Sequence, residues 1–316
     1  MNLQTKILLN KQPHNLIDYK SEIFLLGSCF TEHIGSKLGY FKFQSNVNPF
    51  GILFHPKAIE SLVLNAVKGK VYSNKDIFFN NEQWHCFDAH SKLSNASKDE
   101  LLSCLNKQIK YTNKYIHKST HIIITLGTAW VYKYKETNKV VANCHKIPQR
   151  DFLKEILSVE DVKQSLQHLV DLIRSVNSKT SIIFTVSPVR HLKDGFIENT
   201  LSKSHLISAI HQVIEPQKKL HYFPSYEIMM DELRDYRFYN EDMIHPNPTA
   251  INYIWEKFKL VWISKEEYKI MNEVDVIQKG LQHKPFNPKS EAHKEFLQKL
   301  ERKKQALSKT FPHISF

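Results

Sequence analysis

Three short apolar runs, each ending at a chain-breaking residue, constrain the fold more than any other feature of this sequence. They cover residues 23–26 before Gly27, 122–126 before Gly127, and 182–186 before Ser187 and Pro188. Continuous apolar runs of this length are typical of strands that are buried on both faces, and a proline cannot continue a hydrogen-bonded ladder. The runs therefore predict three strands in the interior of one sheet.

Helical patterns alternate with these strands. Apolar residues recur at helical spacing over 31–38, 160–176 and 248–262. The resulting β-α-β-α-β-α order is typical of a mostly parallel sheet with helices on both faces, whose ligands bind at the carboxyl ends of the strands. We expect this α/β fold, with a helical excursion over 189–222, and we expect the functional residues directly after the strands.

The chain changes character after Gly280. Pro285 and Pro288 indicate a linker, and residues 291–307 form a charged pattern with a narrow apolar strip. A length of 316 residues suits one large domain with an addition. We predict a main domain over 1–280 and a linker with a basic C-terminal helix over 281–316, in which the helix braces the α/β body.

Composition excludes several classes of protein. The chain has only 8 glycines, and neither a G-x-G-x-x-G loop nor a G-x-x-x-x-G-K-[ST] loop is present, which argues against dehydrogenases, kinases and GTPases. The net charge of +12 is spread along the chain without a zinc-finger, helix-turn-helix or RNA-binding motif. We do not expect a nucleic-acid partner, although the basic C-terminal helix leaves a polyanion contact open. No pattern indicates an oligomeric state.

The sequence predicts a cytoplasmic protein. No apolar run reaches the roughly 18 residues that cross a bilayer, and residues 1–11 lack the apolar core of a signal peptide. The 4 cysteines are too few and too scattered for a disulfide framework.

Ser28 and Cys29 lie between the first strand and the following helix. A nucleophile suits this position because the first backbone amides of a helix are unpaired and the helix dipole favours an anion. We expect a lowered pKa for the Cys29 thiol. The alternative is that Ser28 only caps the helix and Cys29 is a small buried residue.

Two further segments carry groups suited to catalysis. Asp242 and His245 are three residues apart before the last core helix, so the carboxylate can orient the imidazole as a general base. Gly127 and Thr128 follow the middle strand and can offer backbone amides to an oxyanion. The alternatives are an ordinary loop histidine and a plain turn.

A zinc site is not expected. Cysteines and histidines do occur at positions 85, 86, 90, 144 and 145, but only His85 and His90 approach the spacing of a structural zinc site. The sequence therefore predicts neither a metal nor a cofactor.

Taken together, these segments resemble those of the GSCFA family, a bacterial group assigned to the SGNH or GDSL-type hydrolase superfamily. The name-giving motif reads Gly27-Ser28-Cys29-Phe30-Thr31, with threonine in place of the final alanine. Further matching stretches are residues 48–51, 127–132, 141–146, 187–191, and 235–239 running to 242–246. The resemblance implies a three-layer α/β/α fold of the flavodoxin-like type.

The resemblance also implies roles for individual residues. Aligned with Gly-Asp-Ser, the motif makes Cys29 the nucleophile, and a shift of one residue would favour Ser28. Gly51 matches a glycine of the oxyanion hole, but Gly127-Thr128 supplies no asparagine where the superfamily has one. A nearby amide or Asn143 would replace it. We interpret three residues as polar lining of the pocket: Asn143, His145 and Arg190. The guanidinium group of Arg190 is suited to bind an anionic part of the substrate.

These roles predict an esterase that removes an acetyl or similar acyl group from a carbohydrate-like substrate. Cys29 or Ser28 would attack the carbonyl, His245 would move the proton and Asp242 would orient His245. Two alternatives stay open: an acyltransferase of cell-surface glycan biosynthesis, and a carbohydrate-binding module without catalysis. The missing asparagine favours the second of these.

Overall fold

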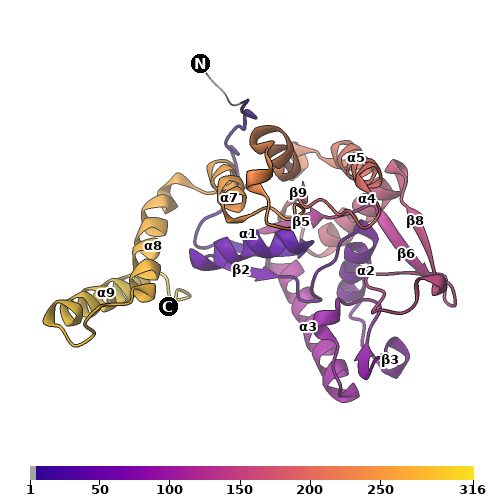
Figure 1. Ribbon diagram of the computed structural model, residues 1–316, viewed down its shortest axis with the longest axis horizontal. Helices are drawn as coiled ribbons and strands as arrows, with labels where there is room; N and C mark the ends of the chain where they lie inside the picture. The colour runs from indigo at the N-terminus through magenta and orange to yellow at the C-terminus, as the bar shows by residue number, and fades with distance from the viewer. Residues whose placement is uncertain (1–4) are drawn as a thin grey trace.

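The computed structural model describes residues 5–316, and its centre is a five-stranded parallel sheet (Figure 1). The strands are β1 (Glu22–Gly27), β2 (Gln44–Val47), β5 (His121–Leu126), β9 (Ser181–Val186) and β10 (Leu220–Phe223), in the order β10-β9-β5-β1-β2. In the register of the central strands, Ile124 pairs with Leu26 on one side and with Phe184 on the other. The three predicted interior strands are confirmed.

Helices cover both faces of the sheet because successive side chains of each strand point to opposite sides. Leu26, Ile124 and Phe184 pack in one core with α2 (Pro56–Val67), α3 (Lys98–Lys118), α4 (Val159–Val176) and α5 (Phe196–Val213). Leu25 and Ile123 pack in a second core with α1 (Cys29–Tyr40) and α7 (Pro248–Trp262). The predicted three-layer α/β/α arrangement is confirmed.

The strand order reverses at β1. The chain first places β2 on one side of β1 and then places β5, β9 and β10 on the other side. Ligands of open α/β sheets bind beyond the carboxyl ends of the strands where the order reverses, which here is the gap between β1 and β5. Ser28 and Cys29 follow β1, and Gly127 and Thr128 follow β5. The fold therefore brings these two segments to the position where a ligand is expected.

The prediction of a helical excursion over 189–222 is confirmed for the helix, which is α5, and wrong for the last residues, which belong to β10. Within this range, α5 is one of the helices that cover the sheet, and β10 is the edge strand beside β9. The sequence Leu-His-Tyr-Phe of β10 is only four residues long and half polar, so it gave no strand pattern.

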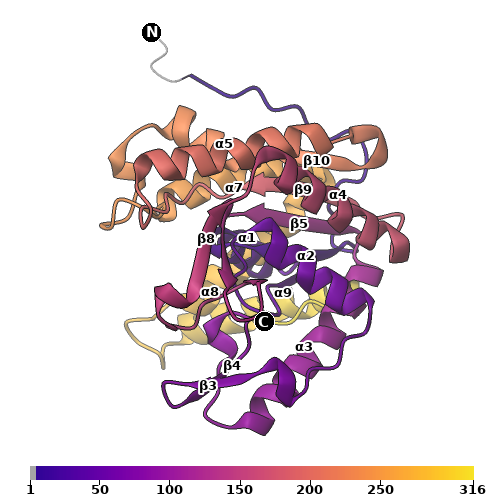
Figure 2. The same cartoon turned by 90° about the vertical axis from the view of Figure 1, so that its right-hand side faces the viewer.

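Two small antiparallel elements lie outside the main sheet. The hairpin of β3 (Phe78–Asn80) and β4 (Gln83–His85) lies near α3, and β6 (Trp130–Tyr134), β7 (Lys139–Val141) and β8 (Phe152–Ile156) form a sheet in the order β7-β6-β8 (Figure 2). A short helix, α6 (Ser225–Glu227), continues into a π-helical turn over Ile228–Leu233.

The C-terminal helix differs from the predicted brace. α9 (Glu291–Thr310) packs on α8 (Tyr268–Gln282) and projects with it from one end of the molecule (Figure 1). Val274, Ile277, Leu300 and Leu307 are buried between the two helices. Only the segment after α9 returns to the α/β body, where Ile314 joins the core around α1 and α7.

No helix within residues 5–316 is long and apolar enough to cross a membrane. Residues 1–4 of the segment 1–11, which the signal-peptide argument used, lie outside the described residues.

Candidate active site

Ser28 and Cys29 differ in their access to solvent. Ser28 is the N-cap of α1, but its side chain makes no capping hydrogen bond and is fully buried, and its amide donates to the Thr125 carbonyl at 3.1 Å. Cys29 is the first helical residue and is half-buried. An approaching substrate therefore meets Cys29 before Ser28.

The expected lowering of the Cys29 pKa is not observed. Burial raises the pKa of this thiol, while the Lys203 ammonium and the backbone N–H groups of Phe30 and Cys29 act in the opposite direction. The backbone N–H groups at the helix start thus stabilise the thiolate as expected. Loss of hydration destabilises it more, because a thiolate is poorly stabilised away from water. Cys29 rests as a neutral thiol near pH 7 and needs a proton acceptor to become a nucleophile.

Asp242 and His245 form the contact that their spacing predicts. Nδ1 of His245 donates to Oδ2 of Asp242 at 2.7 Å, since a carboxylate can only accept. Oδ1 of Asp242 accepts hydrogen bonds from the amides of Ile244 and His245, each at 2.9 Å. These bonds lower the pKa of the Asp242 carboxyl group to about 2. The imidazole is therefore fixed in the tautomer that leaves Nε2 as an acceptor.

Two other histidines interact electrostatically with His245. His33 lies one helical turn after Cys29, and burial lowers its pKa, with a further contribution from the charge of His245. Burial also lowers the pKa of His191 to about 4, with Lys203 and His245 adding to the effect. The His191 ring packs edge-on against Phe54 at 5.3 Å. His245 thus interacts electrostatically with His33, which lies on the face of α1 that carries Cys29.

The backbone amides that sequence suggested for an oxyanion are already engaged. The Phe54 carbonyl accepts the amides of Gly127 at 2.7 Å and Thr128 at 3.0 Å, and the Gly51 amide donates to the Asn48 carbonyl at 2.8 Å. An amide that is bonded within the fold cannot also stabilise an oxyanion. Gly51, Gly127 and Thr128 therefore shape the site without supplying these donors.

Asn48 supplies a donor that sequence reasoning missed. Its side-chain oxygen accepts the Gly27 amide at 2.8 Å, and its Nδ2 is buried without a hydrogen-bond partner among residues 5–316. An unpaired buried donor is costly, so its retention points to a partner that arrives with a ligand. Its position directly after β2, in a stretch that matches the family motif, was the available signal.

Arg190 lies between the His245 loop and a cavity of about 250 Å³. Its amide donates to the Ile244 carbonyl at 3.2 Å, and its guanidinium donates to Asn199 at 3.0 Å and to the Met230 sulfur at 3.4 Å. The cavity is lined by Arg190, Phe196, Met230, Arg234, Asp235, Tyr236, Tyr239 and Met243. Arg190 thus lines a pocket that adjoins the loop that carries His245.

Asn143 and His145 do not line this cavity. Nε2 of His145 donates to the Cys86 carbonyl at 2.8 Å, and Nδ1 accepts from Ser91 at 3.2 Å. Asn143 accepts the His145 amide at 2.8 Å. Burial lowers the pKa of His145 to about 4. Both ring nitrogens are occupied within the fold, so these residues fix the loop around Cys86. No group of three metal-ligating side chains forms a site within residues 5–316.

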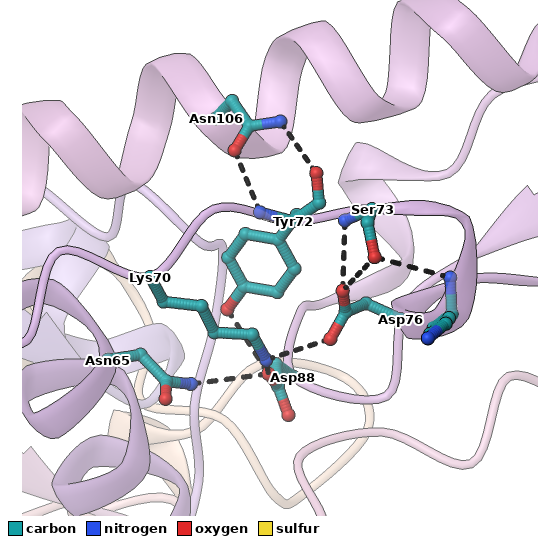
Figure 3. Close-up of polar contacts among 8 residues, drawn as sticks. Asn65, Lys70, Tyr72, Ser73, Asp76, Asp88 and Asn106 are labelled. Carbon is teal, nitrogen blue, oxygen red and sulfur yellow. Dashed lines mark hydrogen bonds and ion pairs between the residues drawn. The ribbon is translucent and has the colours of Figure 1, made fainter.

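A polar network holds the same loop from the other side (Figure 3). Oδ2 of Asp88 accepts from Asn65 at 3.3 Å, from Lys70 at 2.9 Å and from Tyr72 at 3.1 Å. Lys70 also contacts Asp76 at 3.2 Å. These partners satisfy the Asp88 oxygen, which indicates a structural role. The loop that they fix continues to His90, whose Cβ packs against Gly51.

The sequence matches two models of known protein families. Residues 22–258 match the model of the GSCFA family, and residues 274–316 match the model of the C-terminal domain of GSCFA domain proteins. The second match begins within α8. No curated protein matches the chain.

Proposed function

This chain belongs to the GSCFA family, and from that premise we propose that it is an acyl-ester hydrolase with an SGNH-like site. Its substrate is an O-acylated, O-acetyl type ester of a carbohydrate-like molecule. The proposal is carried by the position of Cys29, which starts a helix where the strand order reverses, together with the Asp242–His245 pair, whose imidazole interacts electrostatically with His33 one helical turn after Cys29.

The roles follow from this geometry. The Cys29 sulfur attacks the acyl carbonyl and forms a thioester, and the alcohol leaves. His245, protonated at Nε2 while the ester is cleaved, gives this proton to the leaving alcohol and takes one back from the incoming hydroxyl group, while Asp242 keeps the imidazole oriented. The oxyanion accepts from the Cys29 amide and from Nδ2 of Asn48, which takes the place of the absent asparagine after β5. The cavity beside Arg190 receives an anionic part of the substrate.

Aryl acetate turnover tests the proposal. We expect the wild-type protein to release the phenol, and we expect Cys29→Ala to abolish turnover while the melting temperature stays nearly unchanged. Ser28→Ala is the matched control and keeps activity. Mass spectrometry of a quenched reaction should find the acetyl group on the peptide that contains Cys29. Activity in Cys29→Ala and its loss in Ser28→Ala would assign the nucleophile to Ser28 instead.

One observation favours transfer of the acyl group to an acceptor other than water. Cys29 and His191 are half-buried and Lys203 is buried, so few water molecules reach the thioester. A transferase would yield an acylated sugar faster than free acid when a hydroxylated acceptor is added. A binding module would turn over no ester in any variant, yet its ligand would raise the melting temperature.

A further inference from the structure

Lys203 is buried at the centre of the site without a carboxylate partner within residues 5–316. It lies on α5 with 1% of its surface exposed. Its Nζ donates to the Gly127 carbonyl at 2.7 Å and to the Ser187 carbonyl at 2.8 Å. These are the first residues after β5 and β9, so the amine lies at the carboxyl ends of two central strands.

The number of carbonyl acceptors around Lys203 Nζ equals the number of N–H donors of a neutral amine. An uncharged amino group has two N–H bonds and one lone pair, whereas an ammonium group has three N–H donors. Both N–H bonds of the neutral form are used by Gly127 and Ser187, and the third tetrahedral position then holds the lone pair. A buried ammonium without an anion is strongly disfavoured, so this arrangement suits the neutral form.

Cys29 is the thiol that interacts electrostatically with this amine. Gly127, whose carbonyl binds Lys203, packs so tightly on Ser28 that an added Cβ would lie 3.3 Å from the Ser28 Cβ. Burial lowers the pKa of Lys203 to about 7, and the Cys29 charge is the main interaction that opposes this. Burial also raises the pKa of the Cys29 thiol, and the Lys203 charge opposes it. The two groups therefore stabilise each other's charged forms.

We propose that Lys203 is the proton acceptor that activates Cys29, an inference that rests on the acyl transfer proposed above. The S–H bond of Cys29 breaks, its proton forms the third N–H bond of Lys203, and the sulfur electron pair attacks the acyl carbonyl. When the thioester is cleaved, the departing thiolate recovers this proton from the Lys203 ammonium. Lys203 thus serves the thiol, while His245 serves the hydroxyl groups of substrate and acceptor.

Several other charged groups face the pair and enter its pH dependence. Glu32 of α1 acts on Cys29, Arg190 acts on Lys203, and Tyr226 lies with its ring centre 5.7 Å from Nζ. His191 is coupled to Lys203, to His245 and to Asp194.

Alkylation of Cys29 by iodoacetamide, followed by peptide mass spectrometry between pH 6 and 10, tests the coupling. In Lys203→Met we expect the midpoint of the rate profile to rise by about one pH unit, and the rate near pH 8 to fall about tenfold. Lys163→Met removes an exposed lysine of α4 and should match the wild type. An unchanged profile in Lys203→Met would overturn the proposal. This assay needs no turnover, so it stays decisive even if no ester is hydrolysed.

Titration of the wild-type protein tests the acceptor role without any variant. With ¹³C-labelled lysine, NMR should show one side chain that titrates near pH 7 and shifts when Cys29 is alkylated. If every lysine titrates above about pH 9, Lys203 is permanently charged at neutral pH and cannot accept the proton, and the proposal fails. This outcome is reached whether or not Lys203→Met folds.

Discussion

His245 and Asp242 are joined by a 2.7 Å hydrogen bond between Nδ1 and Oδ2, within a loop whose own amides bind the same carboxylate. One carboxylate thus fixes both the imidazole and the backbone that carries it. We expect Asp242→Asn, His245→Ala and the double variant to lose similar amounts of aryl acetate turnover, because members of one catalytic unit are not additive. If the losses in kcat/KM of the two single variants instead add up in the double variant, Asp242 only stabilises the loop and does not act through His245.

Cys29 should react slowly with iodoacetamide at neutral pH. Its pKa is raised by burial, so the thiolate fraction is small at pH 7 and grows as the pH passes the ordinary thiol range. The controls lie in the same chain. Burial raises the pKa of Cys86 to about 12 and that of Cys144 to about 11, so both should label more slowly at pH 9. Complete labelling of Cys29 within minutes at pH 7 would contradict the burial argument.

Sequence patterns predicted the interior of the sheet better than its edges. The runs that became β1, β5 and β9 are apolar except for one threonine each in β5 and β9, because both faces of these strands are covered. β2 reads Gln-Ser-Asn-Val and β10 reads Leu-His-Tyr-Phe, and polar residues are tolerated there because each is an edge strand.

In the candidate site, the sequence predicted contacts between neighbouring residues better than contacts between segments that are far apart along the chain. Spacing alone predicted the contact of Asp242 with His245, since the two residues lie three positions apart in one loop. Nothing near Gly127 in the sequence indicates that Phe54 occupies its amide, because that bond depends on the tertiary fold. A signal for Lys203 was present but weak: it shares a helical stripe with Leu206 and Ile210, where a lysine is unusual.

Asn48 should affect turnover and stability to different extents. Asn48→Ala removes the free Nδ2 donor and also the acceptor of the Gly27 amide, so we expect a turnover loss of about 10²–10³ and a stability loss of about 1–3 kcal/mol. Asn48→Asp keeps that acceptor but replaces the donor by a carboxylate oxygen, which adds a negative charge at a buried position. Its turnover should fall as far as that of Asn48→Ala. Wild-type turnover in Asn48→Asp would exclude Asn48 from the oxyanion site.

Gly51 should tolerate a side chain much less well than Gly69. Both have positive φ, at 73° and 66°, so alanine at either position costs about 1–2 kcal/mol of backbone strain. A Cβ on Gly51 would lie 2.5 Å from the Cβ of His90, whereas one on Gly69 meets nothing within 4 Å. Overpacking therefore adds about 1–3 kcal/mol in Gly51→Ala alone. Chemical denaturation of both variants measures the difference, and equal losses would show that the loop around His90 yields freely.

The segment after α9 should stabilise the α/β body through Ile314. Its side chain is 2% exposed, and Phe311 packs on Tyr19 with ring centres 5.1 Å apart. Ile314→Ala should lower the free energy of unfolding by about 2–4 kcal/mol. If the segment after α9 detaches from the body first, the loss cannot exceed the free energy with which this segment docks. Deletion of residues 311–316 should therefore lower the melting temperature at least as much, while Phe286→Ala, at a fully exposed position, leaves it unchanged. Cys29 alkylation should be the same in all three variants. If deletion of residues 285–316 instead left the melting temperature intact and removed binding to an acidic polysaccharide, the basic α9 would be a polyanion arm and docking of Ile314 would contribute nothing to stability.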